Sequence, residues 1–171
     1  MITTEKPMNR FIIFTILFTI HSGLFSQKIN PEKDALKKLF RESIKQDSSG
    51  SISTLSNPWI IDNTDNLFFK TDTVKLINIK DVTYKYEFCN FINWSFFKKD
   101  KFFQVESQTC TEPSSVKVSD EYSLHWVTIK QTELGLILNT YKSNGLKDRF
   151  LVLSINRNKK TDEIVLKRID F

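Results

Sequence analysis

Residues 82–110 read VTYKYEFCNFINWSFFKKDKFFQVESQTC, and this stretch decides the expected fold. Apolar residues occupy the even positions from 82 to 88 and again from 92 to 96, whereas most of the odd positions are polar. A period of two is typical of half-buried β-strands, because successive side chains point to opposite faces of a sheet. A loop at 89–91 would make two aromatic cross-strand pairs, Tyr84 with Phe96 and Tyr86 with Trp94. The stretch therefore predicts a β-hairpin with an aromatic inner face.

A second turn is expected at 98–101, and the register of the next strand then brings the two cysteines together. With the chain folded about residues 99 and 100, the opposed pairs are Phe96 with Phe103, Trp94 with Val105, and Cys89 with Cys110. Opposed residues of antiparallel strands lie about 4.5–5.5 Å apart at Cα, which is inside the usual range for a disulfide bond. A cross-strand disulfide is therefore geometrically available, and closing a loop of about twenty residues would stabilise the fold by about 3 kcal/mol.

The rest of the chain predicts further short strands that are joined by short links. They are expected around Trp59 and over 72–79, 122–129, 132–141, 148–155 and 162–169, with turn signals at 143–145 and 156–160. About eight strands result, and an antiparallel meander of that size hides its edges by closing into a barrel. Such a barrel holds packed side chains or one small ligand. The alternative fold is an open, curved antiparallel sheet with a helix across it.

The N-terminus has the organisation of a cleavable signal peptide. Lys6 and Arg10 precede an uncharged run over 11–20, and a less apolar segment follows up to Ser26, the expected cleavage site. Ten residues of helix span only about 15 Å against about 30 Å of hydrocarbon, so a stable membrane anchor is not expected. Met1 and Met8 both fit as the start. We therefore expect a secreted or periplasmic protein, and export favours a disulfide between its only two cysteines.

Residues 27–54 are expected to form an amphipathic helix and a linker ahead of a barrel domain over 55–171. Asn30 and Pro31 are typical of a helix start, and apolar residues recur at helical spacing on one face: Leu36, Leu39, Phe40 and Ile44. This stripe would cap one barrel mouth, because an exposed stripe promotes aggregation, or it would present itself to a partner.

These residues resemble the lipocalin-like domain of small secreted bacterial proteins over about 55–170. The matching features are Trp59 after a helix, the Cys89-x4-Trp94-x-Phe96 strand, and then, in order, Phe103, Cys110, Trp126 and the closing strand 164–168. The resemblance implies a lipocalin-like barrel. It also implies that Arg168 of the last strand stacks on Trp59 of the first strand, closing the barrel base by a cation–π contact.

The aromatic inner face is either a ligand cavity or a packed core. Its candidate ligand-binding residues are Tyr84, Tyr86, Trp94, Phe96, Phe103 and Trp126. Tyrosine hydroxyls inside a barrel need hydrogen-bond partners, which a ligand could supply. The function hypothesis is a non-catalytic protein that binds a small apolar or amphipathic ligand. The alternative is an interaction module for an envelope or secreted protein, with a solid core and no ligand.

Enzymatic, metal-dependent and nucleic-acid-binding functions are not expected. His125, near Asp120 and Glu121, lacks an accompanying nucleophile elbow or phosphate loop, and no cysteine or histidine pair has the spacing of metal ligands, so no cofactor is predicted. Without residues 1–26 the chain carries 23 basic and 19 acidic side chains in 145 residues. This small, scattered excess of positive charge indicates a solvated surface rather than a nucleic-acid site.

Overall fold

The computed structural model describes residues 31–44, 57–81, 83–85, 87–110, 114–117 and 123–169, all of which belong to one compact unit, 31–171. The predicted signal peptide and Tyr86 lie outside the described residues. The described elements are α2 (Pro31–Glu42), β1 (Trp59–Asp62), η1 (Thr64–Asn66), α3 (Leu67–Lys70), β2 (Thr73–Ile79), β3 (Asn90–Lys98), β4 (Lys101–Gln108), β5 (Ser115–Lys117), β6 (Leu124–Thr132), β7 (Gly135–Lys142), β8 (Gly145–Arg157) and β9 (Thr161–Arg168).

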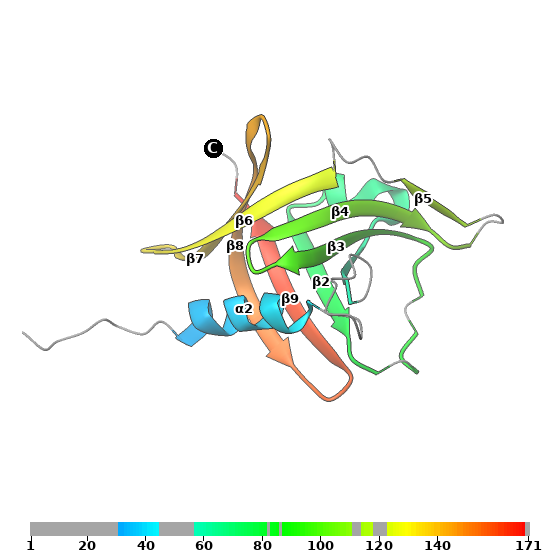
Figure 1. The fold of residues 1–171 in the computed structure, drawn as a ribbon, viewed down its shortest axis with the longest axis horizontal. Helices are drawn as coiled ribbons and strands as arrows, with labels where there is room; N and C mark the ends of the chain where they lie inside the picture. Colours follow the sequence, from blue (N-terminus) through cyan, green and yellow to red (C-terminus); the bar gives the residue numbers. More distant parts are fainter. Residues whose placement is uncertain are drawn as a thin grey trace, which may run out of the picture. The chain divides into compact units, whose positions relative to one another are not determined.

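The strands form a closed antiparallel barrel of eight strands, which confirms the predicted mostly-β fold class (Figure 1). Around the barrel the order is β1, β2, β9, β8, β7, β6, β4 and β3, and β3 pairs with β1 to close it. The ninth strand, β5, pairs only with the far end of β4. The order differs from a simple meander at one place, because the last strand pairs with β2 and not with β1.

This exchange of the first two strands makes the segment 80–89 a crossing connection. Strands β2 and β3 are both antiparallel to β1 and therefore run in the same direction on either side of it. The chain must then return along the length of β1, which a ten-residue segment can do because β1 has only four residues.

The predicted strand over 82–88 is therefore wrong, since the described residues of this segment form no strand. Asp81 interrupts the extended chain: its carboxylate accepts hydrogen bonds from the Thr83 backbone N–H at 2.9 Å and the Thr83 hydroxyl at 2.7 Å. These hydrogen bonds from Thr83 also lower the pKa of the Asp81 carboxyl. Local turn chemistry thus overrides the alternating pattern.

The hairpin predicted about 89–91 is absent, because β3 pairs with β1 and β4 instead. The second predicted turn, at 98–101, is present between β3 and β4, but the register differs from the prediction by one residue. Lys98 pairs with Lys101 as expected, but an irregularity between Phe96 and Lys98 shifts the remaining pairs. Instead of the predicted partners Phe103 and Val105, the observed pairs are Phe96 with Phe102 and Trp94 with Gln104. A β-bulge adds one residue to one strand, which a symmetric register cannot anticipate.

The predicted disulfide between Cys89 and Cys110 is present, with a Cα–Cα distance of 5.1 Å. In the shifted register the residue opposite Cys89 is Thr109, whose backbone N–H donates to the Cys89 carbonyl at 3.0 Å. The bond therefore joins the last residue of the crossing connection to the segment that follows β4, one residue beyond the directly opposed position.

The barrel interior and one face of α2 form a single hydrophobic core, as the helical stripe predicts. Its buried residues are Leu36, Leu39, Phe40, Trp59, Ile61, Phe68, Val74, Leu76, Ile92, Trp94, Phe96, Phe102, Val127, Leu136, Leu138, Phe150, Ile164 and Leu166. The Phe40 ring stacks on Phe96 at 4.3 Å between centroids and meets Trp59 edge-on at 5.7 Å. Helix α2 also packs against β3 and β6. It therefore caps one mouth of the barrel, called here the helix end.

Candidate functional site

The six predicted ligand-binding residues do not form one site. Trp94 and Phe96 lie in the core, where each is at most 2% exposed. Phe103 and Trp126 lie on the outer surface, because their neighbours Phe102 and His125 are the residues that point inward. Tyr84 is half-buried in the crossing connection, and Tyr86 lies outside the described residues. The predicted aromatic inner face is therefore corrected to two separate groups, one inside and one outside.

The interior group is a packed set of rings. Trp94 lies 4.7 Å from Phe102 and 6.2 Å from Phe150 between ring centroids, and its indole N–H donates to Gln104 Oε1 at 3.1 Å. Contacts at these distances are those of a protein core and add to the free energy of folding. Of the two expectations for the inner face, a ligand cavity or a packed core, the structure shows the packed core in this region.

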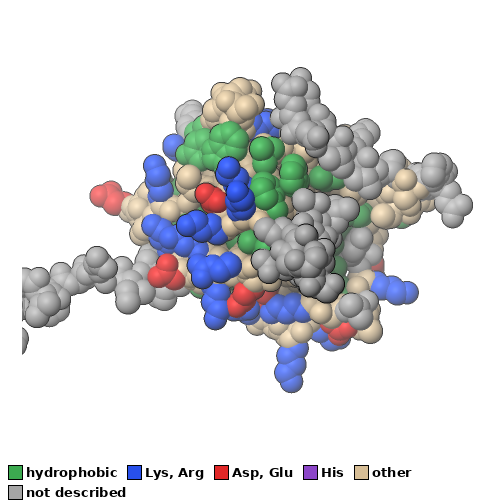
Figure 2. All heavy atoms as spheres, viewed as in Figure 1, with side chains coloured by type: hydrophobic (Ala, Val, Ile, Leu, Met, Phe, Trp, Pro, Cys, Tyr) green, Lys and Arg blue, Asp and Glu red, His purple; other side chains and the backbone are tan. Residues whose placement is uncertain are grey.

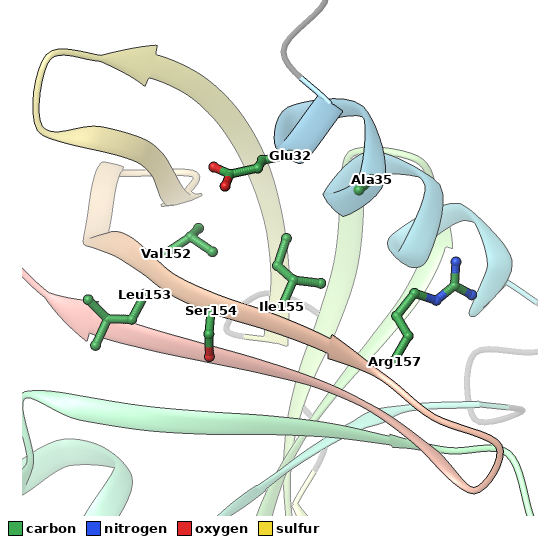
Figure 3. Close-up of a pocket in the computed structure, with 7 residues that line it drawn as sticks. All are labelled: Glu32, Ala35, Val152, Leu153, Ser154, Ile155 and Arg157. Carbon is green, nitrogen blue, oxygen red and sulfur yellow. The ribbon is translucent and has the colours of Figure 1, made fainter.

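The strongest candidate site is a cleft between α2 and β8, called here the helix cleft (Figure 3). Its volume is about 330 Å³, and its lining residues are Glu32, Ala35, Val152, Leu153, Ser154, Ile155 and Arg157. In Figure 3, Val152 and Ile155 point from the strand toward the helix that carries Ala35. Glu32 and Arg157 lie toward opposite ends of the same space. The cleft therefore combines apolar walls with charged groups at its margins, as small-molecule sites do.

A bulge in β8 produces the apolar wall of this cleft. Val152 pairs with Leu166 and Ile155 with Ile164, so both face inward although they are three residues apart. The irregularity lies between Val152 and Ser154, and Leu153 is 49% exposed. Bulges re-aim side chains and are frequent at the rims of barrels.

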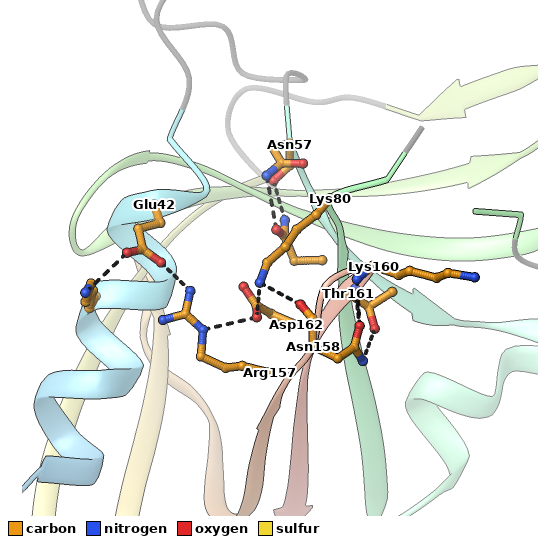
Figure 4. Close-up of polar contacts among 10 residues, drawn as sticks. Glu42, Asn57, Lys80, Arg157, Asn158, Lys160, Thr161 and Asp162 are labelled. Carbon is orange, nitrogen blue, oxygen red and sulfur yellow. Dashed lines mark hydrogen bonds and ion pairs between the residues drawn. The ribbon is translucent and has the colours of Figure 1, made fainter. Parts of the chain in front are cut away.

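A polar network at one end of the helix cleft, called here the Asp162 network, fixes α2 to the barrel (Figure 4). The Asp162 side chain, 4% exposed, accepts from Lys80 Nζ at 2.5 Å and from Arg157 Nε at 3.2 Å. Arg157 Nη2 also donates to Glu42 of α2 at 2.7 Å. Burial lowers the pKa of the Arg157 guanidinium, but the hydrogen bond and charge of Asp162, together with Glu42, raise it overall. Arg157 is thus charged and held in place at the margin of the cleft.

A second cavity, of about 330 Å³, lies at the C-terminal end of β4, and its lining is polar. Its lining residues are Asn63, Asp65, Asn66, Asn90, Glu106, Ser107 and Gln108. The Asn63 side chain is already engaged, since it donates to Glu106 at 3.2 Å and accepts from the Phe68 backbone N–H at 3.2 Å. The described residues contain no cluster of three or more histidine, cysteine or acidic side chains that could hold a metal ion.

Arg168 closes the barrel opposite the helix end, but its partners differ from the prediction. Its guanidinium lies over the rings of Phe68 and Phe150, at 5.4 and 5.3 Å from their centroids, and donates to the Phe68 carbonyl at 3.2 Å. Its Nε is 3.4 Å from the carboxylate of Asp148. The predicted partner Trp59 instead contacts Phe40 at the helix end. The order of the strands explains this, because β9 is a neighbour of β2 and β8 rather than of β1.

His125 is buried in the barrel wall, which the residues beside it in the sequence do not predict. Its Nδ1 lies 2.8 Å from the Ser123 carbonyl, which can only accept, so Nδ1 carries the proton. Its ring stacks on Phe102 at 5.2 Å, and its Nε2 has no hydrogen-bond partner among the described residues. Burial in these surroundings lowers the pKa of His125. The arrangement is that of a neutral core histidine.

The fold defines the class of this protein as a closed, eight-stranded antiparallel barrel with a helix cap and a disulfide, an architecture compatible with a lipocalin-like fold. Comparisons with protein-family models, curated proteins and solved structures find no match to the chain. In the part of the chain that the structure describes, no helix has the length and hydropathy needed to cross a membrane.

Proposed function

We propose that this is an exported binding protein that holds a small amphipathic molecule in the helix cleft. The observation that carries the proposal is the cleft itself, with a volume of about 330 Å³ beside a packed barrel. The size is at the lower end of the range for small-molecule sites. The disulfide supports the export part of the proposal, because such bonds persist mainly in oxidising compartments.

The chemistry of the cleft selects an apolar body with a polar end. Ala35, Val152 and Ile155 supply apolar contacts, while the carboxylate of Glu32 and the guanidinium of Arg157 lie at the margins. Burying apolar ligand surface contributes about 25 cal/mol per Å², and the charged margin leaves a head group in contact with water. A rigid wall favours binding, since the Asp162 network holds Arg157 and α2 in place before the ligand arrives.

The test is calorimetric titration with two eight-carbon amphiphiles of opposite charge, octanoate and octylammonium. We expect saturable binding of at least one of them, and the comparison identifies the preferred head group. Ala35→Trp should weaken binding at least tenfold, because the indole would fill the cleft. Lys37→Trp is the matched control: it adds the same ring to the same helix at an exposed position that does not line the cleft.

Equal binding by the two tryptophan variants would place the ligand elsewhere. Absence of binding by the wild-type protein would favour the alternative function, an interaction module with a solid core. That alternative shares the packed interior and the disulfide but leaves the helix cleft without an occupant.

A further inference from the structure

Six outward-facing apolar residues form a continuous surface across five strands, called here the outer aromatic band. Its members are Phe97, Phe103, Leu124, Trp126, Tyr141 and Leu146. The strand register makes these residues neighbours, since Phe103 pairs with Leu124 and Tyr141 pairs with both Trp126 and Leu146. Phe97 joins the band by stacking on Phe103 at 4.9 Å between ring centroids.

The band is separate from the core and accessible to solvent. None of its members belongs to the core cluster, and each is partly exposed, with Leu146 at 40%. Figure 2 shows hydrophobic side chains gathered over β4, β6 and the base of the β7–β8 hairpin, with Lys and Arg side chains beside them. A contiguous apolar surface of this kind marks an interaction site more often than isolated exposed residues do.

The segments that carry the band are strongly basic. Residues 97–103, 124–130 and 141–149 contain seven lysine or arginine residues and only two aspartates. One of these aspartates, Asp148, is engaged with Arg168. Six lysines lie in these segments: Lys98, Lys99, Lys101, Lys130, Lys142 and Lys147. None of them forms an ion pair with a carboxylate of the described residues.

We propose that the outer aromatic band docks on an anionic lipid surface. Tryptophan and tyrosine favour the boundary between lipid and water, where an apolar ring and a polar group are both accommodated. Lysines at the same surface are attracted to anionic head groups, which supplies the complementary charge. Apolar and electrostatic contacts together give reversible docking rather than insertion.

The observations favour lipid over two other occupants. A second copy of this chain would bring two basic surfaces together, and like charges at an interface oppose association. Single-stranded nucleic acid binds through rings on which bases stack, and the band offers four rings but also two leucines, Leu124 and Leu146, on which no base stacks. A lipid surface accommodates both kinds of side chain, because aromatic and leucine side chains both enter the boundary between head groups and acyl chains.

Trp126 provides a specific optical report of docking. The chain has three tryptophans, and the other two, Trp59 and Trp94, are 0% exposed. A blue shift of tryptophan emission when vesicles are added must therefore come from Trp126. We expect a saturable shift and co-sedimentation with phosphatidylcholine vesicles that contain phosphatidylglycerol, and neither with pure phosphatidylcholine or in high salt.

Variants separate the two contributions to docking. The triple variant Lys98→Gln, Lys99→Gln, Lys147→Gln should weaken co-sedimentation at least tenfold, and Phe103→Ser should weaken it similarly. Trp126→Phe should keep co-sedimentation while losing the emission shift. Leu134→Ser, which removes a 74% exposed leucine outside the band, is the control and should bind like the wild type.

The docking proposal is independent of the helix cleft, and four experimental outcomes would overturn it. These are no binding to anionic vesicles, binding that the lysine triple variant leaves unchanged, preferential capture of a single-stranded oligonucleotide, or a dimer in size-exclusion chromatography that Phe103→Ser dissociates. The lysine residues substituted are all exposed, so this variant keeps the test valid even where Phe103→Ser fails to fold.

Discussion

Two buried polar residues, Asp162 and His125, affect the stability of this barrel in different ways. Asp162 is charged and satisfied by two cations from different parts of the chain, Lys80 and Arg157. His125 is neutral and keeps one nitrogen without a hydrogen-bond partner among the described residues. A paired buried charge holds elements together, whereas a neutral buried histidine makes stability sensitive to pH.

Asp162→Asn should destabilise the protein by about 1–2 kcal/mol. The amide keeps the shape but removes the charge that faces Lys80 and Arg157, and both cations are partly exposed, so water compensates part of the loss. Urea unfolding measures the change. Glu163→Gln, which removes the more exposed ion pair with Lys75, should cost less than about 0.5 kcal/mol. Equal effects of the two substitutions would show that the Asp162 network stabilises the protein no more than an exposed ion pair does.

His125 should make the protein less stable as the pH falls below about 6.5, the ordinary pKa of histidine in the unfolded chain. Burial lowers its pKa in the folded state, so below that pH the unfolded chain binds a proton that the folded chain does not bind. Its contribution to stability is complete above the unfolded pKa and is lost as the pH falls through the folded pKa. The slope is at most about 1.4 kcal/mol per pH unit. Unfolding at pH 7.5 and 5.5 should show a smaller difference for His125→Gln than for the wild type.

Helix α2 is part of the barrel core rather than an appendage. Phe40→Ala should destabilise the protein by about 3–4 kcal/mol, because Phe40 is fully buried and contacts Phe96 and Trp59. Arg41→Ala, at an exposed position on the same helix, should change stability by less than about 0.5 kcal/mol. Denaturant unfolding compares the two. A small effect of Phe40→Ala would mean that the barrel does not need its cap.

The disulfide fixes the end of the crossing connection to β4. The double variant Cys89→Ser, Cys110→Ser should lose about 3 kcal/mol, since the bond closes a loop with a sequence separation of 21. Guanidinium unfolding with and without a reducing agent provides the measurement. Reduction should destabilise the wild type to the level of the double variant and leave that variant unchanged. A wild type that is insensitive to reduction would show that the connection is held by its other contacts.

The elements differ in how well the sequence predicts them, and doublets of apolar residues explain most of the errors. Phe96-Phe97 and Phe102-Phe103 each place one ring inside and one outside, so alternation alone cannot decide which is which. The bulge beside Phe97 then shifts the register by one residue. In β6, Trp126 and its neighbours carry apolar side chains on both faces. Only the pairing with β4 and β7 determines which of these side chains face the barrel interior. Helix α2 has one apolar face and was predicted correctly.

At the scale of the whole molecule, closure of the barrel follows from the number of strands, but their order does not. An edge left unpaired is a liability, so about eight antiparallel strands favour closure in any order that pairs them all. The exchange of β1 and β2 depends on the long-range contact of β1 with β3, for which the sequence carries no local signal. The same is true of the helix cleft, which needs both the cap and the bulge of β8. In the sequence, the helix cleft is indicated only by the spacing of Val152 and Ile155, which lie three residues apart in one strand.

The central claim is that a small amphiphile binds at the capped mouth and not inside the barrel. Methyl NMR spectra recorded during titration with octanoate or octylammonium test this directly, because both regions contain methyl groups. We predict chemical-shift changes at Ala35, Val152 and Ile155, while Ile92 and Leu138 of the interior stay unchanged. Changes confined to Ile92 and Leu138 would contradict the account and place the ligand in the centre of the barrel.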